Sequence, residues 1–283
     1  MNDPASDWWS TSISDISPGV IRYRGYAVED LIGSTSFASM IWLLLRGDLP
    51  TPGQSYLLER ALVAAVDHGP QAPSIAIARM AMTCGVGINN AVASGINVLG
   101  DVHGGAGQQL MQLMADIREQ TRSGASTVQD AVTQMLAGFR ERKAYVPGFG
   151  HRFHPRDPRR DPLLSAVRDA VDAGEADGEF LAIGEEIERQ LATGRDVPVP
   201  MNIDGATAII YSELGFEPEL GRGIFVLSRS VGALAHAWEE SGSGLRNKGP
   251  IPRPLLPTYT GPPPRPIESA PAQPEATTEG HDD

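Results

Sequence analysis

Three short segments of this sequence hold side chains that can transfer protons and polarise carbonyl groups. The segments are residues 101–106, 148–152 and 202–205. The first two hold His103 and His151 beside glycine, and the third holds Asp204 in a mostly apolar stretch. Imidazoles and carboxylates are the usual proton-transfer groups, and a neighbouring glycine lets a ligand approach the backbone. Together they suffice to remove a proton from carbon and to polarise two carbonyls. Each segment alone is also compatible with an ordinary loop or helix end, with Asp204 as an N-cap.

The composition is typical of a globular cytoplasmic protein. The chain has 283 residues, 41% of them hydrophobic, which is enough for a large core. The formal net charge of −12 argues against nucleic acid or an anionic membrane as a partner, because both need a basic face. The longest apolar run, residues 40–45, is too short to span a bilayer. The single cysteine, Cys84, cannot form an intrachain disulfide, and its small neighbours lead us to expect it buried.

Apolar residues recur at three- and four-residue steps along most of the chain, which predicts an all-α fold. Three of the clearest helical patterns lie in residues 57–66, 206–214 and 223–241. Alternating patterns are scarce, and residues 20–23 are the best candidate for a short strand. Residues 261–283 are rich in proline and then acidic, so we expect a disordered tail there.

Four further segments, taken with the first three, resemble the citrate synthase superfamily, which includes the citryl-CoA lyases and the lyase portion of ATP-citrate lyase. Residues 21–26 and 43–51 look like its amino-terminal signature, residues 67–70 like its first substrate-binding histidine, and residues 224–232 like its late arginine helix. Seven segments in the family's order are a strong signal, although each alone would be weak. The resemblance covers nearly the whole chain.

The resemblance implies a large helical domain with a smaller helical domain inserted into it, closing over the substrates. By this resemblance, residues 21–105 and 204–260 would form the large domain and residues 106–203 the small one. Residues 1–20 would be an amino-terminal extension. The family is also dimeric, so we expect a homodimer in which the neighbouring subunit supplies Arg253 to the site.

The family's catalytic residues fall on His103, His151 and Asp204. By resemblance, Asp204 would be the base that takes a proton from the methyl group of an acyl-CoA. His103 would donate a hydrogen bond to the thioester oxygen, and His151 would donate one to the keto oxygen of a 2-oxo acid. The CoA thioester is then a substrate. We expect no cofactor and no metal, because His103 and His151 lack the close ligand spacing of a zinc motif.

Further residues would bind the substrates. Those that match the family's carboxylate-binding positions are His68, Arg159, Arg229 and Arg253. Arginine suits this role because its planar fork forms two hydrogen bonds with a carboxylate. The residues that we expect at CoA are Val146, Gly148, Phe149, Gly150 and Arg152. Residues 151–160 hold four arginines in an acidic protein, which would be either a landing site for CoA phosphates or a solvated loop.

Three functions follow from these expectations. The main interpretation is a citrate synthase-type enzyme that makes or breaks the C–C bond between an acyl-CoA, such as acetyl-CoA, and a 2-oxo dicarboxylate, such as oxaloacetate. The alternative is a citryl-CoA lyase that cleaves citryl-CoA to acetyl-CoA and oxaloacetate, which suits a chain shorter than typical citrate synthases. A non-catalytic helical dimer is the third, and the complete set of His103, His151 and Asp204 argues against it.

Overall fold

The computed structural model describes residues 8–266 except 153, 195–196, 253 and 256. The chain divides into two units, Met1–Lys248 and Gly249–Asp283. All helices and strands of the described residues lie in the first unit. None of the described helices combines the length and the apolar character needed to cross a membrane.

The expected all-α fold is confirmed, with one small sheet at its start. The strands β1 (Ser14–Ser17), β2 (Val20–Tyr23) and β3 (Tyr26–Ala27) pair antiparallel in the order β1-β2-β3. The helices that follow along the chain are α2 (Val28–Ser34), α3 (Phe37–Arg46), α4 (Pro52–Ala65), α5 (Pro73–Thr83), α6 (Ile88–Asn97), α7 (Ala106–Arg122), α8 (Val128–Glu141), α9 (Arg160–Asp172), α10 (Glu179–Ala192), α11 (Ile203–Glu213) and α12 (Pro218–Ser241).

Helices begin where the sequence supplies caps and prolines. Ser36 Oγ accepts a hydrogen bond from Ser39 N at 3.1 Å and caps α3. Thr51 and Gln54 form a capping box at the start of α4. The first residues of α4, α5 and α12 are prolines, which cost no helical hydrogen bond at that position because the amide there has no intrahelical acceptor. The proline-rich breaks in the sequence therefore fix several helix boundaries.

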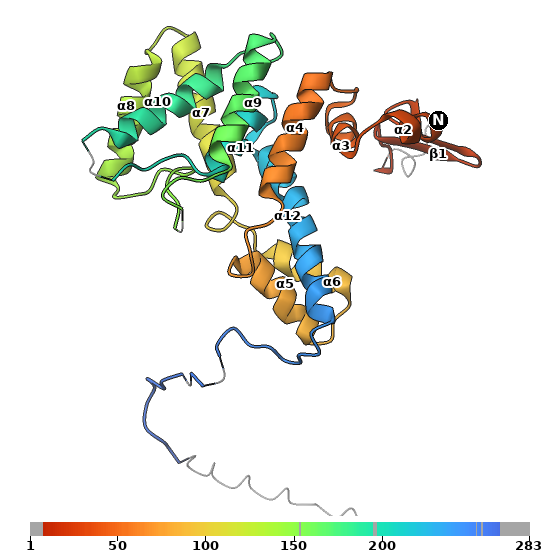
Figure 1. The fold of residues 1–283 in the computed structure, drawn as a ribbon, viewed down its shortest axis with the longest axis vertical. Coiled ribbons are helices and arrows are strands. Elements are labelled where there is room, and N and C mark those ends of the chain that lie inside the picture. Colours follow the sequence, from red (N-terminus) through yellow and green to blue (C-terminus); the bar gives the residue numbers. More distant parts are fainter. Residues whose placement is uncertain (1–7, 153, 195–196, 253, 256, 267–283) are drawn as a thin grey trace, which may run out of the picture. The chain divides into compact units, whose positions relative to one another are not determined.

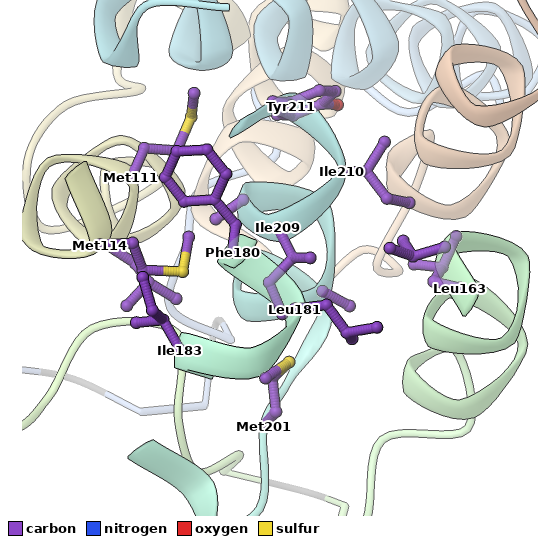
Figure 2. Packing of buried hydrophobic residues seen from close by; sticks show 14 of the residues in the cluster. Met111, Met114, Leu163, Phe180, Leu181, Ile183, Met201, Ile209, Ile210 and Tyr211 are labelled. Carbon is purple, nitrogen blue, oxygen red and sulfur yellow. The ribbon is translucent and has the colours of Figure 1, made fainter. Parts of the chain in front are cut away.

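One apolar cluster forms most of the core. It gathers buried side chains from α4 and from α7 to α11, and Figure 2 shows those of α7, α9, α10 and α11 meeting. A smaller cluster of Ala72, Ile75, Ala78 and Ala233 joins α5 to α12. The 24-residue α12 contacts α4, α7 and α11 as well as α5 and α6, so it links the two clusters (Figure 1).

A glycine lets α12 come close to the end of α4. A Cβ on Gly232 would lie only 2.2 Å from the carbonyl oxygen of Val66. The absence of a side chain at this position therefore brings the Arg229 turn of α12 against the chain that leads to His68. Ser228 Oγ donates a hydrogen bond to the Leu62 carbonyl oxygen at 2.6 Å and holds the same contact.

Two details differ from the expectations. Cys84 is exposed rather than buried, because it caps the carboxyl end of α5 in the turn that leads to α6. The sheet contains β1 and β3 in addition to the predicted residues 20–23, and both are short and largely exposed, so they carry little apolar alternation. The division into a large domain and an inserted small domain stays a prediction.

Candidate active site

Two loops meet at the start of α11 because glycines permit it. Gly148 has a φ of +81°, in the left-handed region, and a Cβ on it would lie 3.0 Å from Gly205 Cα. A Cβ on Gly205 would in turn lie 2.5 Å from the Gly148 oxygen. Asn202 N donates a hydrogen bond to Gly148 O at 3.0 Å, and Asn202 Nδ2 donates one to Gly150 O at 2.7 Å. The loop of residues 146–152 is thereby fixed to the start of α11.

Asp204 lies in the first turn of α11 and is half-buried. The N-cap is Asn202, whose Oδ1 accepts hydrogen bonds from the N–H groups of Asp204 at 2.9 Å and Gly205 at 3.2 Å. The Asp204 carboxylate is therefore not required as a cap. Burial raises the pKa of Asp204, and the nearby guanidinium groups of Arg229 and Arg159 oppose that rise. A carboxyl group in such surroundings is suited to general acid–base work.

His103 accepts a hydrogen bond from the first turn of α5. The Ser74 N–H donates to His103 Nε2 at 3.2 Å, and Ser74 Oγ lies 3.0 Å from the same nitrogen. This amide has no partner within its own helix, and the positive end of the helix dipole disfavours a charged imidazole. Burial and then the Arg229 charge lower the pKa of His103. His103 is thus a neutral imidazole with its proton on Nδ1, able to donate to a substrate oxygen.

Three imidazoles lie against one another beside this loop. The ring centroids of His68 and His151 are 5.0 Å apart, those of His151 and His154 are 4.5 Å apart, and those of His68 and His154 are 6.1 Å apart. The His154 N–H donates to His151 Nδ1 at 3.0 Å, which leaves the proton of a neutral His151 on Nε2. Burial lowers the pKa of both His68 and His151, and positive neighbours add to the effect. Neutral imidazoles here can act as hydrogen-bond donors.

Arg229 is the common neighbour of these groups. It is 5% exposed, its Nε donates to the Ala65 carbonyl oxygen at 3.2 Å, and its guanidinium carbon lies 4.9 Å from the centre of the Phe225 ring. Burial lowers the pKa of Arg229, while the charge of Asp204 opposes that shift. Arg229 also lowers the pKa of His68 and His103. The α12 arginine therefore lies close to both the predicted base and the predicted donors.

Arg159 is held by Asp157. Its Nε and Nη2 donate to the two oxygens of Asp157 at 2.9 and 2.8 Å, a two-bond pairing. Asp157 is 1% exposed, and its Oδ2 also accepts a hydrogen bond from the Ile203 N–H at 3.0 Å. Burial alone would raise the pKa of Asp157, but these hydrogen bonds and the Arg159 charge outweigh it and lower the pKa. The buried carboxylate of Asp157 thus connects the loop that holds Arg159 to the first turn of α11.

A cavity of about 750 Å³ opens beside His151. Four of the five residues expected at CoA line it, namely Val146, Phe149, Gly150 and Arg152, while Gly148 lies behind them against α11. Arg140, Lys143 and Arg152 give its wall three cations, and Tyr145 adds an exposed aromatic ring. Such a wall suits a long ligand with an apolar portion and negative charges.

The four arginines of residues 151–160 do not form a free basic surface. Arg159 is paired with Asp157, Arg156 with Asp161, and Arg160 with Asp161 and Glu188. Arg152 is exposed and lines the cavity. Of these four arginines, Arg152 is therefore the one that can contact CoA phosphates in the cavity, and it is the arginine that the sequence assigns to CoA.

The structure brings most of the predicted site residues into one region. His103, Asp204, His68 and Arg159 are all close enough to Arg229 for their charges to interact, and His151 contacts His68. Arg253 lies outside the described residues. The sequence reasoning missed four supporting residues, namely Ser74, His154, Asp157 and Asn202. His154 is three residues after His151, and that spacing was the only signal that could have revealed it.

The imidazole cluster does not have the form of a metal centre. Across the described residues, no group of three or more His, Cys, Asp or Glu side chains is arranged to hold a metal ion. The cluster is bordered by arginines instead, and such surroundings suit anionic oxygens.

Comparisons with known proteins identify the family to which the chain belongs. The family model "Citrate synthase, C-terminal domain" matches residues 6–56 and 51–255. The citrate synthase of Haloferax volcanii is 28% identical over 209 residues, which are 73% of this chain and 52% of that protein. The chain thus spans about half the length of the curated relatives that it matches.

Two solved structures are also similar. The citryl-CoA lyase from Hydrogenobacter thermophilus has a TM-score of 0.78 and 33% identity, covering 92% of this chain and 97% of that one. The ATP citrate lyase from Methanothrix soehngenii, in complex with citrate and coenzyme A, has a TM-score of 0.75 at 20% identity and covers 92% and 43% of the two chains, which shows a shared fold. Because the family model matches most of the length of this chain, the chain belongs to the citrate synthase family.

Proposed function

We propose that this chain is a citryl-CoA lyase, which cleaves citryl-CoA to acetyl-CoA and oxaloacetate and can run the same step in reverse. The observation that carries the proposal is the match to the Hydrogenobacter thermophilus lyase, which extends over nearly all of both chains at 33% identity. The curated citrate synthases match over only about half of their length. This difference favours the lyase, the alternative drawn from the sequence, over the main interpretation.

The C–C bond step divides among three groups. In the direction of synthesis, Asp204 takes a proton from the methyl group of acetyl-CoA. The Nδ1–H of His103 donates to the thioester oxygen and stabilises the enol that forms. The enol carbon attacks the keto carbon of oxaloacetate, whose oxygen takes the Nε2 proton of His151 and becomes the hydroxyl group of citryl-CoA. The proton held by Asp204 passes to solvent, and solvent reprotonates His151. Cleavage of citryl-CoA is the reverse: His151 takes the hydroxyl proton as the C–C bond breaks, and Asp204 returns a proton to the methyl carbon.

Two arginines and neighbouring imidazole donors bind the two carboxylates of oxaloacetate. His68, Arg159 and Arg229 take this role by family position, and His154 adds a third imidazole to the cluster. Arg229 is well suited because its hydrogen bond to the Ala65 carbonyl oxygen uses Nε, and within the described part of the chain its terminal nitrogens bond to no other group. Burial of these groups strengthens their attraction for an anion.

The CoA part of the substrate would occupy the cavity beside His151. Its apolar wall of Val146, Phe149 and Leu191 suits the pantetheine arm, and its cations suit the phosphates. The cavity lies next to the loop whose backbone is fixed to the start of α11. A thioester that extends from it would therefore point toward Asp204.

A homodimer is part of the proposal and is supported by one face of α12. Leu227, Val231, Leu234 and Trp238 recur at four-, three- and four-residue steps and are 47%, 55%, 48% and 71% exposed. This spacing is that of two helices packing along their length, so the occupant that we assign to the face is α12 of a second copy. Leu234→Asp should convert the dimer to a monomer in light scattering, and Val197→Asp, an equally apolar exposed site elsewhere, should not. A wild-type monomer at micromolar concentration would contradict the assignment.

The assay that separates the two activities starts from citryl-CoA. A lyase releases oxaloacetate and no free thiol, whereas a synthase hydrolyses citryl-CoA and therefore releases free thiol, whether or not some oxaloacetate is also formed. Oxaloacetate is followed by its reduction with NADH and malate dehydrogenase, and thiol by a colorimetric reagent. Oxaloacetate release that is lost in Asp204→Asn supports the lyase. Thiol release that depends on Asp204 would favour citrate synthase. If neither oxaloacetate nor thiol is released, both activities are excluded.

A further inference from the structure

A second, much smaller cavity is lined by Asp204 and lies between α7, α11 and α12. The space open to the centre of a water molecule there is about 10 Å³. That is roughly the room that one water needs. Its polar side chains come from Gln108 of α7, from Asp204, Thr207 and Tyr211 of α11, and from Arg222 of α12.

Two buried polar atoms of this lining have no hydrogen-bond partner among the described residues. They are the Tyr211 hydroxyl and Arg222 Nε. Tyr211 is only 2% exposed, so bulk water does not reach its hydroxyl. Arg222 donates through Nη2 to Asp101 Oδ1 at 2.5 Å, which leaves Nε as its unsatisfied donor. A buried polar atom without a partner is costly, so both atoms call for a small polar occupant of the cavity.

The geometry of α11 directs Tyr211 toward Asp204. Positions 204, 207 or 208, and 211 share one face of a helix, and long helical side chains lean toward the helix amino terminus. Tyr211 stands at the end of the buried cluster in Figure 2, next to Met111 of α7. Burial raises the pKa of Tyr211, and the negative charge of Asp204 adds to the rise. The hydroxyl is therefore close enough to the carboxylate to interact with its charge.

We propose that one ordered water in this cavity connects the Tyr211 hydroxyl and Arg222 Nε to the Asp204 carboxylate, and that Tyr211 is a positioning residue for the base. Arg222 Nε and the tyrosine hydroxyl donate to the water oxygen, and the water donates to the carboxylate. This satisfies both unpartnered atoms at once, and the hydrogen bond from the water stabilises the ionised form of Asp204. The role of Asp204 as base rests on the proposed function, but the water bridge does not.

The test is a titration of Asp204 in the full-length protein with and without the hydroxyl. Carbon-13 NMR of labelled aspartate carboxyl groups follows the titration, and Asp204→Asn assigns the signal. Tyr211→Phe removes one hydrogen bond that favours the charged form, so the pKa of Asp204 should rise by about half to one unit. Tyr56→Phe, at an exposed tyrosine of α4, is the matched control and should leave the titration unchanged.

A second variant covers the possibility that Tyr211→Phe does not fold. Arg222→Lys keeps the charge opposite Asp101 and removes the Nε donor, so it should move the pKa of Asp204 in the same direction. The acid limb of acetyl-CoA methyl exchange should move upward with it. An unchanged Asp204 titration in whichever variant folds would overturn the water bridge, whatever the activity. Lyase activity that does not depend on Asp204, or no lyase activity in the wild-type protein, would instead overturn the proposed function. The titration result would still decide the water bridge.

Discussion

The Ser74 N–H donates a hydrogen bond to Nε2 of His103 at 3.2 Å, which fixes the tautomer of that imidazole. Because a backbone amide can only donate, Nε2 must be the unprotonated nitrogen, and Nδ1 carries the proton. Burial and the Arg229 charge lower the pKa of His103, so the ring stays neutral at pH 7. The neutral ring can therefore donate its Nδ1 hydrogen bond to the oxygen of the developing enol at pH 7 without any change in protonation state.

The first prediction concerns this tautomer. Nitrogen-15 NMR of labelled histidine, with His103→Ala to assign the signals, should show His103 neutral and protonated on Nδ1 at pH 7. Its titration should lie below the usual histidine range, because burial disfavours the charged form. A His103 that is protonated at pH 7, or protonated on Nε2, would contradict the assigned hydrogen bond.

Asp204→Asn should separate catalysis from stability. The rate should fall by roughly 10²–10⁴, the usual effect of losing a positioned acid or base. Because the pKa of Asp204 is raised on folding, its contribution to stability is present at low pH and is lost as pH rises through the folded pKa. Asp204→Asn should therefore be at least as stable as wild type at pH 7 in urea unfolding.

The control for that variant is the neighbouring cap. Asn202→Ala removes the acceptor of two helical amides and should cost about 0.5–2 kcal/mol of unfolding free energy. Activity of Asp204→Asn close to wild type, or its loss only together with unfolding, would make Asp204 a structural residue.

Asp157→Asn tests the connection between the loop that holds Arg159 and α11. Asn keeps the shape but loses the charge that pairs with Arg159, so the variant should bind the oxo acid more weakly and show a higher KM for oxaloacetate. Breaking a buried ion pair should also cost about 3 kcal/mol in urea unfolding at pH 7. Since the pKa of Asp157 is lowered on folding, this stabilising contribution is present above its unfolded pKa and is lost as pH falls through the folded pKa. A stability difference from wild type that persists unchanged under strongly acidic conditions would contradict the pairing.

His154→Asn tests the third imidazole of the cluster. Its backbone N–H, which bonds His151 Nδ1, is kept in the variant, so the tautomer of His151 should survive. Loss of the ring should raise KM for oxaloacetate about tenfold or less and leave kcat nearly unchanged, as expected for one lost contact to a bound carboxylate. A fall in kcat with an unchanged KM would place His154 in the chemical step instead.

Much of the fold was predictable because its signals are local. Apolar spacing, prolines and cap residues act within one or two turns, and they located α4, α11 and α12 to within a few residues. The exposed strands β1 and β3 carry no comparable pattern, and Cys84 was misjudged because composition does not reveal that a residue lies in a turn.

The site was predictable in part for a different reason. His103, His151 and Asp204 stand in short segments whose order along the chain is distinctive. The residues that support them act across long separations, as Ser74 does for His103 and Asp157 for Ile203. Their residue types are ordinary in sequence, and only the fold shows their role. The N-cap function that suited Asp204 in the sequence belongs to Asn202 two residues earlier.

Exchange of the acetyl-CoA methyl protons with solvent deuterium tests the central claim most directly. It is measured by proton NMR with a non-reacting oxo-acid analogue bound, so it needs the base and the thioester donor but no reacting keto group. We expect His103→Ala to abolish exchange, because the enol oxygen loses its donor. His151→Ala should keep part of the exchange while losing net C–C chemistry, with some loss if His151 also helps the site to close. The reverse order would mean that the two roles are exchanged, and full exchange in both variants would contradict the assignment of these histidines to catalysis.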